Sequence, residues 1–217
     1  WIVGKNGLIL NTTNGGQNWG PQTSGTNIFL SSVFFINKNT GWVAGGYPYE
    51  SVILHTTDGG MSWNHQLFGE FSHLESIYFV NSEVGWAVGY AGTILKTTNG
   101  GINWFTQTSN SIEWLFSVHF INENVGWAVG NAGTIIKTTN GGNNWITIAS
   151  GTQVVLYSVN FSNNVGWVVG HGGLVLKSTD EGENWNTQLK KTNKSLHSIN
   201  CFDENNVWIV GEGGSIL

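Results

Sequence analysis

Short apolar runs, rich in β-branched and aromatic residues and broken by Gly and Asn, recur along the whole chain. In one representative stretch they read SVHFI (117–121), VGWAVG (125–130), GTIIKTT (133–139) and NWITIA (144–149). None of these runs has the apolar period of a helix. Runs of this length and composition are typical of strands. We therefore predict four strands, A to D, in this stretch.

The four runs repeat with a period near 41 residues. The Trp that opens run D recurs at spacings of 44, 41, 41 and 40 residues. Four short antiparallel strands in about 40 residues are typical of one β-propeller blade. The sequence thus predicts an all-β fold, a single β-propeller over residues 1–217. The repeats are approximately 1–30, 31–73, 74–114, 115–155, 156–195 and a partial 196–217.

A box of the form [ST]-x-[DN]-x-G-x-x-W separates runs C and D in five repeats. Asn-Gly supplies the positive φ angles of a tight hairpin, and Thr and Asn or Asp side chains can satisfy the backbone of the turn. A calcium loop would need several carboxylates, and a P-loop would need Gly before Lys-Thr. We therefore interpret the boxes as structural turns. Their key residues are Asn14, Trp19, Asp58, Trp63, Asn99, Trp104, Asn140, Trp145, Asp180 and Trp185.

The strand count predicts an incomplete blade at each end. The N-terminal repeat supplies runs B to D, four full repeats follow, and the last supplies A to C, which gives 22 strands. The chain begins at Trp1 without Met, so we expect a processed chain or a piece of a longer one. Our hypothesis is part of a six- to eight-bladed ring; the alternative is six blades, each terminal one lacking a strand. Open strand edges favour self-association.

Composition narrows the choice of function. Charged residues make up 10 % of the chain, its eight basic side chains are all Lys, and its net charge is −5. An acidic chain without Arg is a poor candidate for binding nucleic acid. No apolar run has the length of a membrane span. One Cys and six scattered His residues argue against a disulfide framework, a metal site or a cofactor.

The Trp residues are the largest apolar groups, and eleven of the twelve occupy two repeated positions, one in run B and one in the box. A buried Trp side chain removes about 150–250 Å² from water. We therefore expect all eleven to lie in the core. Trp114 stands outside both positions, where other repeats have Phe29, His73, Val155 and Ser195, so we expect it to be more exposed.

The boxes are similar to the Asp-box, or BNR repeat, of sialidase-like propellers. In combination with GWAVG and GTILKTTNGG (92–101) they resemble the photosystem II stability/assembly factor family and its bacterial relatives, over the whole chain. The resemblance implies a propeller whose function lies in its loops. Sialidases use an arginine triad, and the assembly factors are expected to use an Arg-rich patch for their client; this chain has neither. Xyloglucan-type hydrolases place catalytic Asp residues outside the boxes, where only Asp203 lies here.

Candidate site residues are those that depart from the repeat on the B-to-C and D-to-A loop face. The loop GYPYES (46–51) is three residues longer than its equivalents, and two Tyr with a carboxylate suit a sugar or a peptide. Each candidate also has an interpretation without a binding role. The loop 46–51 would be only a longer surface loop, and Trp114 would only pack locally. The candidates for binding a ligand or partner are Tyr47, Tyr49, Glu50, His73, Glu113, Trp114 and His171.

The sequence favours a non-catalytic scaffold, secreted or on a cell surface, that binds a protein partner or copies of itself. A thylakoid lumen is the alternative location. A carbohydrate-binding propeller is the second hypothesis, resting on Tyr47, Tyr49 and Trp114. A fragment of a glycoside hydrolase, with Glu50 and Glu113 as acid and base, is the third. We expect no catalytic residues and no cofactor.

Overall fold

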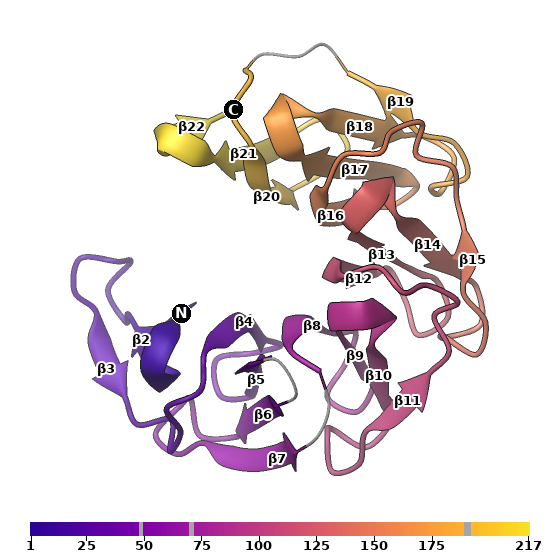
Figure 1. Ribbon diagram of the computed structural model, residues 1–217. Helices are drawn as coiled ribbons and strands as arrows, with labels where there is room; N and C mark the ends of the chain where they lie inside the picture. The colour runs from indigo at the N-terminus through magenta and orange to yellow at the C-terminus, as the bar shows by residue number, and fades with distance from the viewer. Residues whose placement is uncertain (48–49, 70–71, 189–191) are drawn as a thin grey trace. The chain divides into compact units, whose positions relative to one another are not determined.

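The computed structural model describes residues 1–47, 50–69, 72–188 and 192–217. The chain divides into two compact units, Trp1–Thr106 and Gln107–Leu217, and each is built from three antiparallel sheets. Within these described residues there are 22 strands in six sheets, which we call blades 1 to 6 (Figure 1). The six blades lie within the predicted range, and the first and last have three strands each, as the strand count required.

The first unit holds blades 1 to 3, in which consecutive strands pair with one another. Blade 1 is β1 (Ile2–Val3), β2 (Ile9–Asn11) and β3 (Gly20–Gln22); blade 2 is β4 (Leu30–Phe35), β5 (Gly41–Tyr47), β6 (Glu50–Thr56) and β7 (Asn64–Gly69); blade 3 is β8 (Leu74–Phe79), β9 (Gly85–Gly89), β10 (Ile94–Thr97) and β11 (Phe105–Gln107).

The second unit repeats this pattern in blades 4 to 6. Blade 4 is β12 (Leu115–Phe120), β13 (Gly126–Gly130), β14 (Ile135–Thr138) and β15 (Ile146–Thr147); blade 5 is β16 (Leu156–Ser162), β17 (Val165–Gly170), β18 (Val175–Ser178) and β19 (Asn186–Thr187); blade 6 is β20 (Leu196–Cys201), β21 (Val207–Gly211) and β22 (Ser215–Ile216). Strands A to D are thus confirmed as separate elements, with a shorter strand D than predicted.

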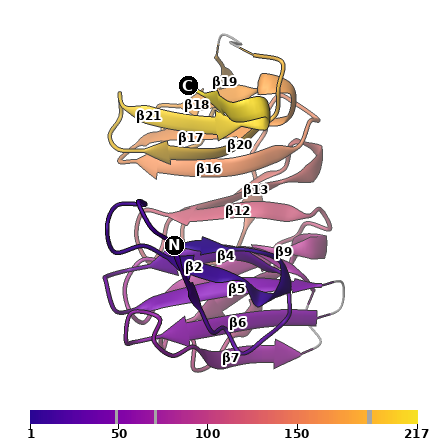
Figure 2. The same ribbon diagram turned by 90° about the vertical axis from the view of Figure 1, so that its left-hand side faces the viewer.

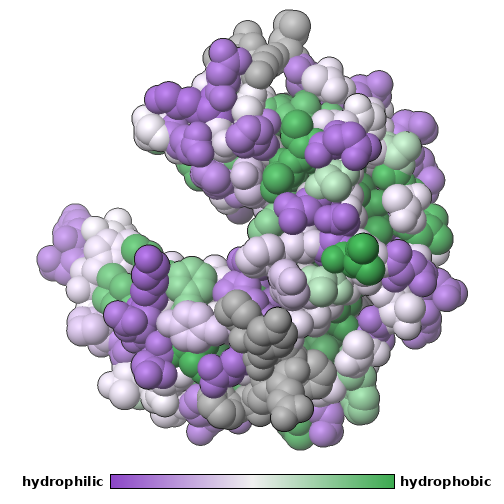
Figure 3. Space-filling model, in the orientation of Figure 1, coloured by the Kyte–Doolittle hydropathy of each residue, from purple (hydrophilic) through white to green (hydrophobic). Residues whose placement is uncertain are grey.

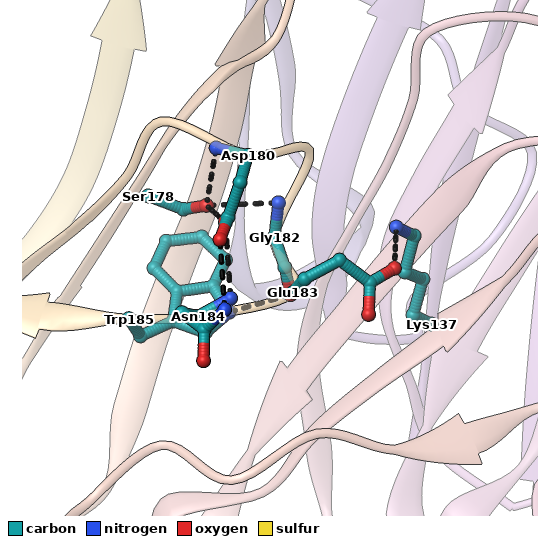
Figure 4. Close-up of polar contacts among 7 residues, drawn as sticks. All are labelled: Lys137, Ser178, Asp180, Gly182, Glu183, Asn184 and Trp185. Atoms are coloured by element: carbon teal, nitrogen blue, oxygen red, sulfur yellow. Dashed lines mark hydrogen bonds and ion pairs between the residues drawn. The ribbon is translucent and has the colours of Figure 1, made fainter.

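The boxes form the turns between strands C and D, as predicted. In blade 5, Ser178 Oγ donates to Asp180 Oδ1 (2.7 Å) and accepts from Gly182 N (2.8 Å). The Asp180 carboxylate accepts from the side chain and backbone of Asn184, and these bonds, with that from Ser178, lower its pKa to about 2. Trp185 Nε1 donates to Gly182 O (3.1 Å) (Figure 4). The polar groups therefore satisfy one another inside the turn.

An uncharged box makes the same turn. In blade 4, Thr138 Oγ1 donates to Asn140 Oδ1 (3.1 Å) and accepts from Gly142 N (2.9 Å), and Asn144 N donates to Asn140 Oδ1 (2.9 Å). The amide oxygen of Asn140 thus replaces a carboxylate oxygen of Asp180. Because the turn does not need a negative charge, its side chains are explained by the hairpin alone.

Inside each unit, three aromatic rings pack together at a junction between two adjacent blades. Trp127 of blade 4 stacks on Phe161 of blade 5 (ring centroids 3.7 Å apart), and Trp185 of blade 5 meets the same ring edge-on (5.8 Å). In the first unit, Trp42 and Trp104 enclose Phe79 in the same way. We call this arrangement the three-ring junction. Its central Phe comes from strand A, and the two Trp come from consecutive repeats.

The expectation that all eleven repeated Trp lie in the core is wrong at both ends of the repeat array. Trp19 is 41 % exposed, because blade 1 has no strand A to supply the Phe of its junction. Trp208 is 64 % exposed, because no blade follows blade 6 in the described chain. Trp42, Trp86 and Trp127 have no exposed surface. Burial of a repeated Trp therefore depends on the other strands of its junction, which the repeated motif alone does not reveal.

Cys201 occupies the Phe position of the junction between blades 5 and 6. It is half-buried and packs with Trp167 and Val207 around the core cluster of these blades. Burial raises the pKa of its thiol to about 11. The thiol is therefore protonated at neutral pH.

A buried cation lies beside one three-ring junction. The Lys137 side chain is 3 % exposed, and its Nζ lies 5.4 Å from the centroid of the Trp127 ring. Its partner is Glu183 Oε1, at 2.6 Å, from the box of blade 5 (Figure 4). A buried charge needs such a partner. In blade 2, His55 holds the strand position that Lys137 holds in blade 4, and its ring stacks on Trp42 with the ring centroids 4.9 Å apart.

The last Gly of the GWAVG motif is required because the backbone around it leaves no room for a side chain. A Cβ on Gly130 would lie 2.0 Å from Trp114 O, the carbonyl that accepts from Asn131 N. Replacing Gly130 with alanine should therefore lower the free energy of unfolding by about 1–3 kcal/mol, the usual cost of overpacking. Urea denaturation monitored by Trp fluorescence measures this.

Gly4 provides the matched control for that substitution. It holds the same repeat position in blade 1, where strand A is absent, and a Cβ there would meet nothing nearer than Leu8, at 3.8 Å. Gly4→Ala should leave the unfolding midpoint nearly unchanged. Equal losses in the two variants would contradict the steric explanation.

Candidate functional site

The second unit carries a row of aromatic rings along its strands A. Trp114 stacks on Phe116 (centroids 5.4 Å apart), Phe116 contacts Tyr157 (5.8 Å), and Tyr157 contacts His197 (4.8 Å). The last three occupy the second residue of β12, β16 and β20, and Trp114 directly precedes β12. We call these four residues the aromatic row. It crosses all three blades of this unit.

The aromatic row is partly open to solvent and ends in charged groups. Trp114, Phe116 and Tyr157 are half-buried, and the His197 side chain is 49 % exposed. His197 Nε2 lies 3.8 Å from Glu212 Oε1, and Glu212 Oε2 accepts from Ser195 N (3.1 Å). These rings can therefore contact a partner on one side while they pack on the blades with the other.

Two further predicted residues lie close to the aromatic row. His171 is exposed, and its Nδ1 shares a hydrogen bond with Ser195 Oγ (3.2 Å), which links it to the Glu212 end. Glu113 is half-buried beside Trp114, and its backbone N donates to Ser111 Oγ. Within the second unit the structure thus brings Trp114, Glu113 and His171 into one region around strands A.

The equivalent positions of the first unit are polar and internally paired. His73 Nδ1 lies 2.6 Å from Gly46 O, and Nε2 lies 3.1 Å from Glu75 Oε1. Burial lowers the pKa of His73, but its contacts with Glu75 and Gly46 outweigh that effect and raise it above the ordinary value. The His73 ring stacks on Phe29 (5.9 Å). His73 therefore holds the hairpin of blade 2 in place.

The predicted long loop 46–51 is largely a strand extension. Tyr47 and Glu50 are paired residues at the ends of β5 and β6. Tyr47 is 44 % exposed and Glu50 is half-buried. Tyr49, the third candidate from this loop, lies outside the described residues. The hairpin therefore presents Tyr47 and Glu50 from one face, because cross-strand partners point to the same side of a sheet.

Sequence reasoning missed Phe116, Tyr157, His197 and Glu212. Aromatic residues in a strand look like core residues in a single sequence. The signal was present at the second position of strand A, where Ser31 and Glu75 give way to three consecutive rings. Among the described residues, no group of three or more His, Cys, Asp and Glu side chains is arranged to hold a metal ion. No described helix is long and apolar enough to cross a membrane.

Solved structures resemble this fold. YCF48 bound to D1 peptide is 23 % identical, with a TM-score of 0.55, and the match covers 100 % of this chain and 87 % of that one. YCF48 from Cyanidioschyzon merolae is 20 % identical, with a TM-score of 0.54, covering 100 % and 89 %. The GH74 enzyme of Niastella koreensis is 17 % identical, with a TM-score of 0.70, covering 97 % of this chain but only 41 % of the enzyme. At these identities the likeness concerns the fold.

Sequence comparison is more specific. No curated protein matches the chain. The model of the photosynthesis system II assembly factor YCF48 family matches residues 1–71, 69–148 and 107–216, which together span nearly the whole chain. The resemblance inferred from the boxes and the GWAVG motifs is thereby confirmed, and the chain belongs to the YCF48 assembly factor family.

Proposed function

We propose that this chain is a non-catalytic propeller that binds a protein partner through the aromatic row. The observation that carries the proposal is the unbroken series of contacts from Trp114 to His197 across three blades. Aromatic residues are enriched in the buried centres of protein interfaces, where they offer large contact areas at low entropic cost. A family member has been solved with a D1 peptide, which supports a peptide as the partner's contacting part.

The charges near the aromatic row favour a partner segment that is not strongly acidic. Glu212 is exposed at one end and Glu113 is half-buried at the other. The chain has no Arg to hold a carboxylate in two-pronged geometry. We therefore infer an extended segment that places apolar or aromatic side chains on the rings and neutral or basic groups near the two carboxylates.

Binding of peptides selected on the immobilised protein tests this function. Dodecapeptides that bind the wild-type protein would first be enriched from a random phage-displayed library. The Kd of each enriched peptide would then be measured. The double variant Trp114→Ala, Tyr157→Ala should raise their Kd at least tenfold, because hot-spot aromatics contribute strongly to affinity. Phe105→Ala, which removes an aromatic side chain that is 60 % exposed in the first unit, should not change Kd.

Two results would overturn the proposal. One is the absence of any enriched peptide; the other is enrichment of peptides whose affinity survives the double variant. Circular dichroism of each variant shows whether the fold is retained. If the double variant unfolds, Tyr157→Phe and Tyr157→Ser supply a graded replacement, in which only the serine should weaken binding.

Self-association is a second candidate, favoured by the exposed face of blade 6. Trp208, Val210 and Ile216 are 64 %, 45 % and 66 % exposed on β21 and β22. Light scattering after gel filtration would detect association, which Trp208→Ser should reduce.

We also propose that the protein works outside the cytoplasm, on a cell surface or in a lumen; fractionation of the native source tests the location.

A further inference from the structure

Blade 2 departs from the other blades in the length of its outer strands. Its strands β5, β6 and β7 have seven, seven and six residues, whereas β13, β14 and β15 have five, four and two. In the other blades a three-residue 3₁₀ turn, such as Asn131–Gly133, closes strands B and C. Figure 2 shows β5, β6 and β7 side by side along the extended sheet.

The extension enlarges a cavity between blades 1 and 2. The cavity has a volume of about 870 Å³ and is lined by the loop after β3, by the turn after β1, and by Glu50 and His65 of blade 2. Corresponding hollows in the second unit have volumes of about 350 Å³ and 190 Å³. The hollow is thus a repeated feature, and the volume of this copy lies well inside the range of typical small-molecule sites.

The strand register places Tyr47 on the same sheet face as Glu50, which lines the cavity. Tyr47 pairs with Glu50, and Leu54 pairs with His65, so each pair shares one face of the sheet. Val52 and Leu54 of that face pack into the core against blade 1. Glu50 lines the cavity where the same face runs past the core. Tyr47 is exposed, and as the cross-strand partner of Glu50 it is the next residue on this face beyond the cavity lining.

The cavity lining combines apolar surface with hydrogen-bond donors and acceptors and is largely uncharged. Asn6, Thr23 and Asn27 line it together with Glu50, and within the described part of the chain these four side chains have no hydrogen-bond or ion-pair partner. Amides both donate and accept, and hydroxyls do the same. On the face shown in Figure 3, hydrophilic residues are interspersed with hydrophobic ones over both units.

From this geometry we propose that the cavity between blades 1 and 2 is a subsite for a neutral oligosaccharide. Sugar hydroxyls match the amides of Asn6 and Asn27, a carboxylate such as Glu50 accepts from two hydroxyls, and the ring of Tyr47 offers an apolar face for a pyranose. An anionic ligand is disfavoured by Glu50 and by the absence of Arg. This site is separate from the aromatic row and does not depend on the function proposed for it.

Calorimetric titration of the whole chain with neutral oligosaccharides tests the subsite. The probes are cellohexaose, xylohexaose, mannohexaose and chitohexaose, with a Lys-containing hexapeptide as the cationic probe. At least one oligosaccharide should bind. Glu50→Ala should raise its Kd about tenfold or more, because hydrogen bonds to charged groups are the strongest of their kind. Tyr47→Ala should raise the Kd by a similar factor, because it removes the apolar face offered to a pyranose. Asn27→Ala should weaken binding severalfold.

Gln153 provides the matched control. It lines the 350 Å³ hollow of the second unit at the position corresponding to Asn27, and Gln153→Ala should leave Kd unchanged. Absence of binding by all four oligosaccharides, binding that survives both Tyr47→Ala and Glu50→Ala, or binding of the peptide alone would each overturn the proposal. Tyr47 and Glu50 are not core residues, so both variants should remain folded, and thermal melting of the variants checks this.

Discussion

Replacing Trp127 with alanine is expected to lower the free energy of unfolding by about 3–5 kcal/mol, the usual cost of deleting a large core side chain. Trp127 is fully buried, and its ring stacks on Phe161 at 3.7 Å. Phe161 belongs to the next blade, so the substitution opens a cavity between two sheets. The same change removes the ring beside the buried ammonium of Lys137. Equilibrium denaturation in urea measures the loss.

Trp208 supplies the control, because it holds the same position in its repeat and is 64 % exposed. Trp208→Ala should cost clearly less than Trp127→Ala, within the small range of ordinary surface substitutions. Trp114→Ala should fall between the two, since Trp114 is half-buried and stacks on Phe116. Similar losses at Trp127 and Trp208 would show that the three-ring junction is not the source of stability.

The second large effect is a loss of stability in acid that arises from His119. This side chain is 9 % exposed, and burial lowers its pKa from 6.5 to about 4. The unfolded chain therefore binds a proton more readily than the folded chain. The contribution of His119 to the free energy of unfolding is therefore complete above pH 6.5 and is lost as the pH falls from 6.5 to 4. At 1.36 kcal/mol per pKa unit the loss reaches about 3 kcal/mol.

Urea denaturation at a series of pH values tests this prediction, with His119→Asn as the control. Asn160 and Asn200 hold the same strand position in blades 5 and 6, so the substitution is compatible with a blade. In the variant, the slope of the free energy of unfolding against pH should become much smaller between pH 6.5 and 4, where the smaller effect of half-buried His55 is left. Any slope below pH 4 should remain, because Asp58 and Asp180, both with pKa values near 2, take up protons there. An unchanged slope in the variant would contradict the role of His119.

The repeat determined how much of the fold could be predicted. Strand order and turn positions follow from local residues, such as the Thr or Ser and the Asn or Asp of each box, and these were predicted correctly. The burial of Trp19 and Trp208 could not be predicted in the same way, because it depends on strands that blade 1 lacks or that would follow blade 6. The strand extension of blade 2 was read as a loop, since Gly46 and Pro48 resemble turn residues.

The candidate site was predicted only in part. Trp114 stood out because it broke the repeat, and the structure places it in the aromatic row. Phe116 and Tyr157 did not stand out, because a ring in a strand is usually a core residue. Glu50 stood out because of its loop, whereas its position at the cavity depends on the loop after β3, which lines the same cavity in the folded chain.

The three-ring junction also bears on how such a chain can grow. Each junction takes one Trp from one repeat, and the Phe and second Trp from the next. A gene duplication of one period therefore adds one complete junction wherever its breakpoints fall, and leaves no ring without its neighbours inside the array. Only the two ends keep unmatched rings, and their number stays the same however many blades are added. Selection can thus alter the number of blades without having to redesign any interface between them.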